Sequence, residues 1–212
     1  MQQAFGIDVP ETVAEMCRSS RSSVLVYDAQ VGIYQHVRER DQVVERTGQI
    51  LSVARELDVP VFYVRHVSLP PSHLGAAALK TAMAWQRTDK ATEVTQAFPP
   101  GAEHSQLMPE LAPVGAEPVF DKLGMSAFVG TPLEASLRDR GVTTLLLVGA
   151  VLEIGIEPTA RHAADLGFFP VVVEDACGVV EPEAAERAVT SLDYTFMCYR
   201  SSTADAVAAL RG

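Results

Sequence analysis

Two side chains of opposite charge stand where aliphatic runs of the sequence end. Asp28 closes the run "VLVYD", and Lys122 closes the shorter run "VFDK". If both runs are strands of an open parallel sheet, the two side chains lie at its carboxyl edge, where such sheets bind ligands. A carboxylate that faces an ammonium group in a partly dry cleft acquires a pKa suited to proton transfer. We therefore predict that the fold brings Asp28 and Lys122 together as a candidate proton-transfer pair, with a turn acid and a solvated surface lysine as the alternatives.

Several other residues near predicted strand ends are candidates for binding a substrate. Arg87 and His66 would contact an anionic group, with Trp85 and Phe128 as apolar walls. A lone arginine or tryptophan in a long loop is more often structural or placed at an oligomer contact, so this alternative stays open. The candidate binding residues are Gln30, Tyr34, His66, Trp85, Arg87, Phe128, Ala150, Val151 and Glu153.

The elements that must position these side chains alternate between short aliphatic runs and longer amphipathic stretches. The pattern predicts strands at residues 22–30, 60–67, 117–122, 142–150 and 169–178, and helices at residues 41–59, 131–141, 157–167 and 181–196. Strands that read as continuous apolar runs between helices indicate a parallel sheet that is covered on both faces. The sequence therefore predicts an α/β fold.

Two segments fall outside this alternation. Residues 68–113 form a long excursion between the second and third strands, in which "HLGAAALKTAMAWQR" could be a helix. Excursions of this length are usually lids, binding loops or oligomer contacts. Residues 1–21 form an N-terminal extension without the apolar core of a signal peptide. No apolar stretch is long enough to cross a membrane.

Composition bounds the possible functions. The chain has 212 residues, which suits a single domain over residues 1–212, and its 48% hydrophobic and 21% charged residues are typical of a globular protein. Its net charge of -10 disfavours nucleic-acid and membrane partners, which need a basic face. A small-molecule substrate, even an anionic one, can still bind where a few cations converge. Cys17, Cys177 and Cys198 show neither disulfide nor zinc-ligand spacing, so we expect reduced thiols in a cytoplasmic protein.

Four stretches of the sequence resemble a known family in order and spacing, from about Ser22 to the C-terminus. These stretches are "VLVYDAQ", "VFYVRH", "VFDKLGMSAFVGTPLEASLRDRGVTTLLLVGAVLEIGIEPTARHAADLGF" and "VVVEDACG". They resemble the isochorismatase-like hydrolases, also called the cysteine hydrolase superfamily. The resemblance implies a three-layer α/β/α fold with a mostly parallel six-stranded sheet, and a homodimer or homotetramer. It places Asp28 and Lys122 on the catalytic aspartate and lysine of the family.

The resemblance places the family's nucleophilic cysteine on Gly155. The family pattern G-V-A-T-x-x-C-V-x-x-T-A corresponds to "GAVLEIGIEPTA", residues 149–160. Glycine has no side chain to act as a nucleophile, which excludes thioester chemistry at this position. Gly155 is then either a helix-start glycine of a protein without activity or part of a site whose reaction needs no nucleophile. We favour the second interpretation, because a protein without activity would have little reason to keep both Asp28 and Lys122. The resemblance agrees with it, since isochorismatases and related phenazine-pathway hydrolases lack the cysteine.

The predicted reaction is hydrolysis of the enol ether of isochorismate or of a related small metabolite. Such an ether is cleaved by protonating its terminal methylene carbon, which requires a general acid. Asp28 would be that acid, Lys122 would bind a substrate oxygen, and backbone N–H groups near Gly155 would orient a carbonyl or carboxylate. No cofactor is needed.

Departures from the isochorismatase pattern leave other functions open. The first motif is "DAQVGIY" rather than D-M-Q followed by an aromatic pair, and the turn before Gly155 carries Glu153, which suits a neutral or cationic substrate. A cysteine-free lyase or isomerase and a silent small-molecule binding protein are the alternatives. His66 and His73 resemble metal-binding histidines of nicotinamidases, but the required Asp-x-His arrangement is missing, so we predict no metal site.

Overall fold

A six-stranded parallel sheet forms the centre of the molecule. The computed structural model describes residues 1–212, and the strands are β3 (Ser22–Tyr27), β4 (Val61–His66), β5 (Val119–Lys122), β6 (Thr144–Ala150), β7 (Phe169–Gly178) and β8 (Tyr199–Ser201). Their order is β5-β4-β3-β6-β7-β8, and every neighbouring pair is parallel. The predicted six-stranded α/β/α fold is confirmed, and its sheet is parallel throughout.

The central strands are apolar because both of their faces are covered. All residues of β3 and β6 are buried. Leu25 pairs with Phe62 of β4 on one side and with Leu147 of β6 on the other. Alternate β3 side chains enter different cores, with Val24 and Val26 in one and Leu25 and Tyr27 in the other.

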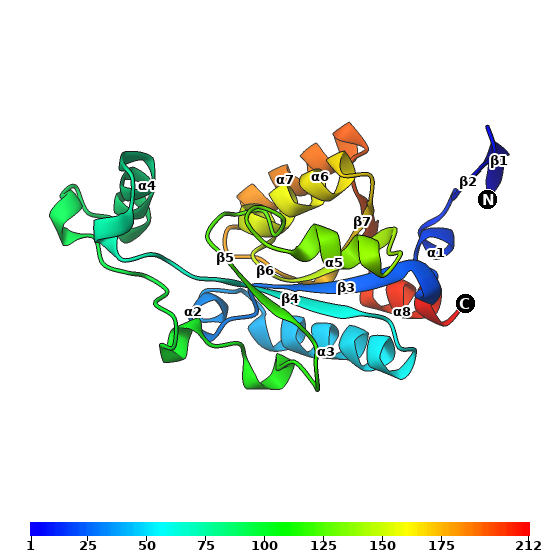
Figure 1. Ribbon diagram of the computed structural model, residues 1–212, viewed down its shortest axis with the longest axis horizontal. Helices are drawn as coiled ribbons and strands as arrows, with labels where there is room; N and C mark the ends of the chain where they lie inside the picture. The colour runs from blue at the N-terminus through cyan, green and yellow to red at the C-terminus, as the bar shows by residue number, and fades with distance from the viewer.

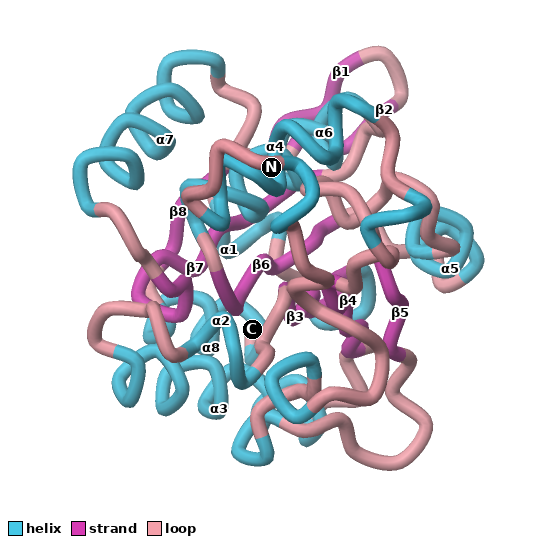
Figure 2. Tube along the Cα trace, turned by 90° about the vertical axis from the view of Figure 1, so that its left-hand side faces the viewer, coloured by secondary structure: helices cyan, strands magenta, loops and turns pink.

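Helices cover the two faces of the sheet (Figures 1 and 2). One face carries α3 (Arg40–Glu56) and α8 (Thr203–Arg211), whose Ile50 and Leu210 enter the first core. The other face carries α5 (Leu133–Asp139), α6 (Glu157–Asp165) and α7 (Pro182–Thr195), whose Leu137 and Leu192 enter the second core. The short helix α2 (Val31–Tyr34) follows β3, and a π-helical turn, η6 (Leu152–Ile156), joins β6 to α6.

The N-terminal extension folds into a hairpin and a short helix. β1 (Gln2–Ala4) pairs with β2 (Ile7–Val9), and α1 (Val13–Met16) and the 3-10 turn η1 (Ser19–Arg21) lead into β3. None of the helices combines the length and the apolar character that a membrane span requires.

The excursion between β4 and β5 divides into an arm and a return segment. The arm, residues 68–98, contains η2 (Pro71–His73), α4 (Ala76–Gln86) and η3 (Ala91–Glu93) and extends well beyond the rest of the molecule (Figure 1). The return segment, residues 99–118, contains η4 (Glu103–Ser105) and η5 (Pro109–Leu111) and lies against α2 and α3. The helix predicted within "HLGAAALKTAMAWQR" is therefore α4.

Candidate functional site

Asp28 and Lys122 are brought together at the carboxyl edge of the sheet. Asp28 follows β3, and Lys122 is the last residue of β5, two strands away. Its Nζ donates a hydrogen bond of 2.8 Å to Asp28 Oδ2. Both side chains are buried, with 1% of Lys122 and 7% of Asp28 exposed. The predicted contact between the two residues is therefore present.

Burial sets the electrostatics of this pair. Loss of solvent raises the pKa of Asp28 to about 6, against the opposing effect of the Lys122 ammonium group. Burial also lowers the pKa of Lys122 from its usual value, although Asp28 favours the charged ammonium. Asp28 Oδ1 is buried without a hydrogen-bond partner. The carboxyl group therefore holds one engaged oxygen and one unengaged oxygen, with a pKa suited to proton exchange.

Lys122 is held by two further contacts. Its Nζ donates to the carbonyl of Gly124 at 3.2 Å and lies 4.3 Å from the ring centroid of Tyr27. An ammonium group over a desolvated aromatic face gains a cation–π attraction. The lysine is thus fixed by a carboxylate, a carbonyl and an aromatic ring.

The backbone turns sharply at Asp28, which has a left-handed φ of 42°. Aspartate tolerates this region better than most residues, and such conformations cluster at functional sites. Asp28 N still donates to Val64 O at 3.0 Å, and Asp28 O accepts from Gln30 N at 2.7 Å. The turn ends the strand and directs the carboxyl group along the edge of the sheet.

Gln30 braces three segments around Asp28. Its Nε2 donates to the carbonyls of His66 at 2.9 Å and Ser105 at 3.0 Å, and its Oε1 accepts from His66 N at 2.8 Å. Gln30 also pairs with Leu107 of the return segment. Because all these bonds go to backbone groups, Gln30 fixes the positions of the chain around the site.

Gly155 packs directly against Tyr27. A Cβ atom built on Gly155 would overlap the Tyr27 hydroxyl oxygen and two of its ring carbons. The Tyr27 hydroxyl donates to the carbonyl of Met125, and burial raises its pKa far above the usual value. Tyr27 was missed among the candidate residues, although a bulky aromatic residue directly before Asp28 was a visible signal.

The backbone N–H groups around Gly155 are already engaged. Those of Ile154, Gly155 and Ile156 all donate to the carbonyl of Val151, at 3.3, 3.0 and 3.1 Å. The expectation that these groups orient a substrate is therefore wrong for this conformation, because the π-helical turn uses them internally. Ala150 and Val151, joined by a cis peptide bond, are buried beside this turn.

The Glu153 side chain binds the backbone at the start of α7. Its Oε1 accepts from the N–H groups of Val180 and Glu181 at 2.9 and 2.7 Å, which places a negative charge at the positive end of that helix. Its Oε2 is buried without a partner. Glu153 therefore fixes the two residues that precede α7, a tertiary contact that sequence spacing does not reveal.

Three candidate binding residues occupy different surroundings near the sheet edge. Tyr34, the last residue of α2, is fully buried in the first core, and its hydroxyl group has no hydrogen-bond partner. Phe128 is buried against His162 and Phe168. His66 is half-buried with its ring edge against Phe98, and burial together with Lys122 lowers its pKa to about 4. Of the three, His66 lies closest in register to Lys122, its β5 partner.

Trp85 and Arg87 do not reach the site of their own chain. Trp85 lies on α4 and Arg87 ends that helix, on the arm that extends away from the body (Figure 1). The prediction that they line the pocket is therefore wrong for a single chain. The arm is tied at its base, where Ser68 N donates to Phe98 O at 2.9 Å and Phe98 N donates to Ser68 Oγ at 2.7 Å.

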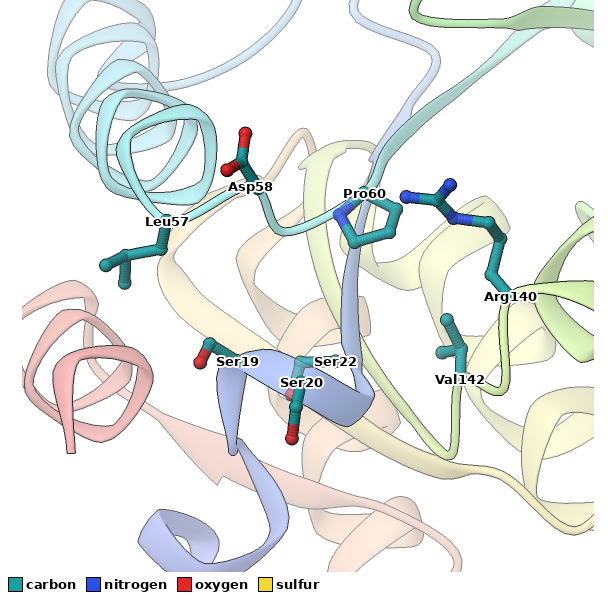
Figure 3. A pocket seen from close by; sticks show the side chains of 8 residues that line it. All are labelled: Ser19, Ser20, Ser22, Leu57, Asp58, Pro60, Arg140 and Val142. Carbon is teal, nitrogen blue, oxygen red and sulfur yellow. The ribbon is translucent and has the colours of Figure 1, made fainter.

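A separate hollow lies at the other end of the sheet. It has a volume of about 330 Å³ and is lined by Ser19, Ser20, Ser22, Leu57, Asp58, Pro60, Arg140 and Val142 (Figure 3). Ser22 begins β3, so this hollow faces the amino ends of the strands. The Asp28–Lys122 pair lies at the carboxyl ends and is the better candidate site, because it joins buried, charged and titratable groups.

The chain has no metal-binding cluster, and its three thiols are buried. No three His, Cys, Asp or Glu side chains lie close enough together to hold a metal ion. Cys17, Cys177 and Cys198 are buried. Burial raises the pKa values of Cys17 and Cys198 to about 12, and that of Cys177 well above its usual value.

The fold and this strand-end pair define an α/β enzyme of the isochorismatase class. The isochorismatase domain profile matches residues 22–205, and the chain belongs to this family of hydrolases.

Similar proteins agree with this assignment. The chain is 32% identical to the uncharacterized isochorismatase family protein YecD of Escherichia coli O157:H7, over 81% of this chain and 87% of that protein. It is 30% identical to the ureidoacrylate amidohydrolase RutB of Methylobacterium radiotolerans, over 76% of this chain and 65% of that protein. A cysteine hydrolase structure from Pseudomonas syringae pv. phaseolicola 1448A shares the fold, with a TM-score of 0.76, 22% identity, and coverage of 92% of this chain and 94% of that one.

Proposed function

We propose that this hydrolase acts without a covalent cysteine intermediate, and that it cleaves the enol ether of isochorismate or of a related small metabolite. The observation that carries the proposal is the arrangement around Asp28. A buried carboxyl group with a pKa of about 6 and one unengaged oxygen lies beside a glycine whose side-chain space is filled by Tyr27. This arrangement supplies an acid and leaves no room for a nucleophile at position 155.

Asp28 performs the proton transfer in this proposal. In its neutral form it donates a proton from Oδ1 to the terminal methylene carbon of the enol ether, which leaves an oxocarbenium ion. Water adds to the cationic carbon and loses a proton, and the resulting hemiketal breaks its C–O bond to release pyruvate and an alcohol. The carboxylate takes the proton back and is ready for another cycle. Activity therefore falls as the pH rises through about 6, where Asp28 loses its proton.

Lys122 holds the acid and neutralises its conjugate base. Its ammonium group binds Oδ2, so it favours the carboxylate that remains after proton donation. Gln30 keeps the ends of β3 and β4 and the return segment in register around this carboxyl group. Both residues therefore maintain the geometry of the acid.

Amide hydrolysis is the competing activity, because one relative is named an amidohydrolase. Amide cleavage through a cysteine would require a reactive thiol near Asp28. The three thiols are instead buried with raised pKa values, which makes them poor nucleophiles.

The test is release of pyruvate from isochorismate by the purified protein. We expect turnover that Asp28→Asn abolishes and that thiol alkylation leaves intact. Asp121→Asn is the matched control, since Asp121 is an exposed acid next to Lys122 that pairs with Arg65. Absence of turnover with isochorismate and with simpler vinyl ethers would contradict the proposal, as would ammonia release from a ureido compound that alkylation stops.

A further inference from the structure

The hollow at the amino edge of the sheet lies where three central strands begin. It has a volume of about 330 Å³, and we call it the amino-edge hollow (Figure 3). Its walls come from the turn before β3, from the connection between α3 and β4, and from the connection between α5 and β6. This volume is at the lower end of the range for small-molecule sites. The amino-edge hollow therefore suits a metabolite of few atoms.

Two opposite charges in the amino-edge hollow have no partner within the chain. Asp58 forms no ion pair, whereas Glu56, two residues earlier, pairs with an arginine. Arg140 also forms no ion pair, whereas Arg138 donates to a glutamate of its own helix. In the view of Figure 3 the carboxylate and the guanidinium group lie on opposite sides of Pro60. The two groups therefore do not neutralise each other, and both are available to a ligand.

Three serines, Ser19, Ser20 and Ser22, complete the polar lining of the amino-edge hollow. Ser22 is only 1% exposed, and its hydroxyl oxygen is buried without a hydrogen-bond partner. Ser23, the next residue of β3, instead donates to the carbonyl of Pro60 at 2.8 Å. A buried hydroxyl group without a partner costs free energy. A ligand oxygen that accepts a hydrogen bond from Ser22 would remove this cost.

Asp58 occupies a left-handed turn that glycine fits equally well. At the end of α3, Asp58 N and the following N–H group donate to the carbonyls of Arg55 and Ala54, at 3.4 and 2.8 Å. On the other face of the sheet, α5 and α6 end with the same pair of hydrogen bonds around Gly141 and Gly167. The φ angles at the three positions are 54°, 68° and 84°. A glycine at position 58 therefore keeps the turn and removes only the carboxylate.

The groups of the amino-edge hollow match a small zwitterion. We propose that this hollow binds a free amino acid, or a similar small metabolite that carries one ammonium and one carboxylate group. Asp58 pairs with the ammonium group at the carboxyl end of α3, where the helix dipole also favours a positive charge. Arg140 and the Ser22 hydroxyl group donate to the carboxylate. The site lies at the opposite end of β3 from Asp28, so the proposal does not rest on the proposed function.

Binding is tested with the standard amino acids as probes. Each is added at about 10 mM to a thermal unfolding assay, because a ligand of the folded chain raises its unfolding temperature. Isothermal titration calorimetry then measures the dissociation constant of each amino acid that does so. We expect at least one to bind with a Kd of about 1 mM or less, and its amide and its deaminated acid to bind about tenfold more weakly or worse. Absence of binding by every amino acid, or a deaminated acid that binds as tightly as its parent, would overturn the proposal.

Substitutions locate the bound amino acid. Asp58→Gly and Arg140→Gln should each weaken its binding about tenfold or more, whereas Asp89→Asn and Arg187→Gln, at exposed positions elsewhere, should leave it unchanged. Without ligand, Asp58→Gly should unfold at the same temperature as the natural chain or higher, so lost binding would not reflect misfolding. Asp28→Asn should retain the ligand, because Asp28 lies at the other end of β3. Binding that survives both Asp58→Gly and Arg140→Gln, or that Asp28→Asn abolishes, would contradict this site.

Discussion

The phenol ring of Tyr27 lies in the space that a side chain at position 155 would occupy. Tyr27 is the last residue of β3, and Gly155 belongs to the π-helical turn that follows β6. The ring also faces the Lys122 ammonium group. The bulky residue and the glycine are therefore complementary, and a change at one position has consequences at the other.

Gly155→Cys should destabilise the fold. The new Cβ overlaps the Tyr27 ring, which is held by its contacts with Met125 and Lys122. Overpacking of this kind costs about 1–3 kcal/mol, measurable by urea unfolding. Gly48→Cys is the control, because a Cβ at that position in α3 meets nothing within 4 Å. Equal stability of the two variants would show that the Tyr27 ring yields to the new side chain.

Tyr27→Ala should restore room for a cysteine at position 155. In the double variant Tyr27→Ala/Gly155→Cys, the loss of stability should be smaller than the sum of the two single losses by about 0.5 kcal/mol or more. The comparison needs urea unfolding of the natural chain, both single variants and the double variant. Strictly additive losses would mean that the two residues do not compete for the same space.

The stability of the natural chain relative to Asp28→Asn should fall as the pH rises from about 4 to about 6. The pKa of Asp28 is about 6 in the folded chain and has a usual value of 3.8, so between these values only the unfolded chain has released the proton. Release from the unfolded chain favours unfolding with rising pH, by up to about 3 kcal/mol in total.

His66 affects the pH dependence of stability in the opposite direction between about pH 4 and pH 6. Its pKa is lowered to about 4 in the folded chain, so its contribution to stability rises with pH up to its usual pKa of 6.5. Subtracting the unfolding free energies of Asp28→Asn from those of the natural chain cancels this contribution. A difference that stays constant from about pH 4 to about pH 8 would contradict the raised pKa of Asp28.

Lys122→Met should be among the most destabilising single changes. It leaves a buried carboxylate without its cation, and breaking a buried pair from one side costs about 3–5 kcal/mol near neutral pH. The loss should shrink below about pH 6, because Asp28 then takes up a proton. Arg65→Met provides the comparison, since Arg65 pairs with Asp121 at the surface and should cost about 1 kcal/mol or less. The readout is chemical unfolding at two pH values, and a loss independent of pH would argue against an ionised pair.

Glu153→Ala should act on the stability of α7. The change removes the acceptor of two N–H groups, so we expect a loss of about 1–2 kcal/mol. Glu153→Gln keeps an oxygen acceptor and should lose less. Glu183→Ala, in the first turn of the same helix, should change the unfolding free energy by about 0.5 kcal/mol or less. If Glu153→Ala altered substrate preference but left thermal unfolding unchanged, the structural role of Glu153 at the start of α7 would be wrong.

The natural thiols should react slowly with a thiol reagent such as dithionitrobenzoate. Cys17, Cys177 and Cys198 are buried and have raised pKa values. We expect all three to react quickly only in denaturant, with the native chain as the comparison. A rapid native reaction of one thiol would reveal an accessible cysteine and would reopen covalent chemistry for this protein.

The sheet and its central pair could be predicted because their determinants are local. Continuous apolar runs identify buried parallel strands, and the carboxyl-edge rule then brings Asp28 and Lys122 together without knowledge of the intervening segments. The contact at 2.8 Å follows from strand order and from the reach of a lysine side chain across β4.

The surroundings that the sequence does not predict depend on tertiary relationships. Tyr34 lies in a helix of only one turn, so no periodicity shows that it faces the core. Glu153 finds its partners at Val180 and Glu181, which belong to the next βα connection. Trp85 is carried away from the site by the direction of the arm, which hydrogen bonds at Ser68 and Phe98 constrain. A sequence pattern does not encode these directions.

The strand order also determines when the protein can fold during synthesis. The first strand of the sheet, β3, is central and needs both β4 and β6 as neighbours. Leu25 meets Phe62 early, but its other neighbour, Leu147, leaves the ribosome only after the whole arm, the return segment and β5 have been made. Until then one edge of a strand that is fully buried in the folded protein remains open, which exposes the nascent chain to aggregation.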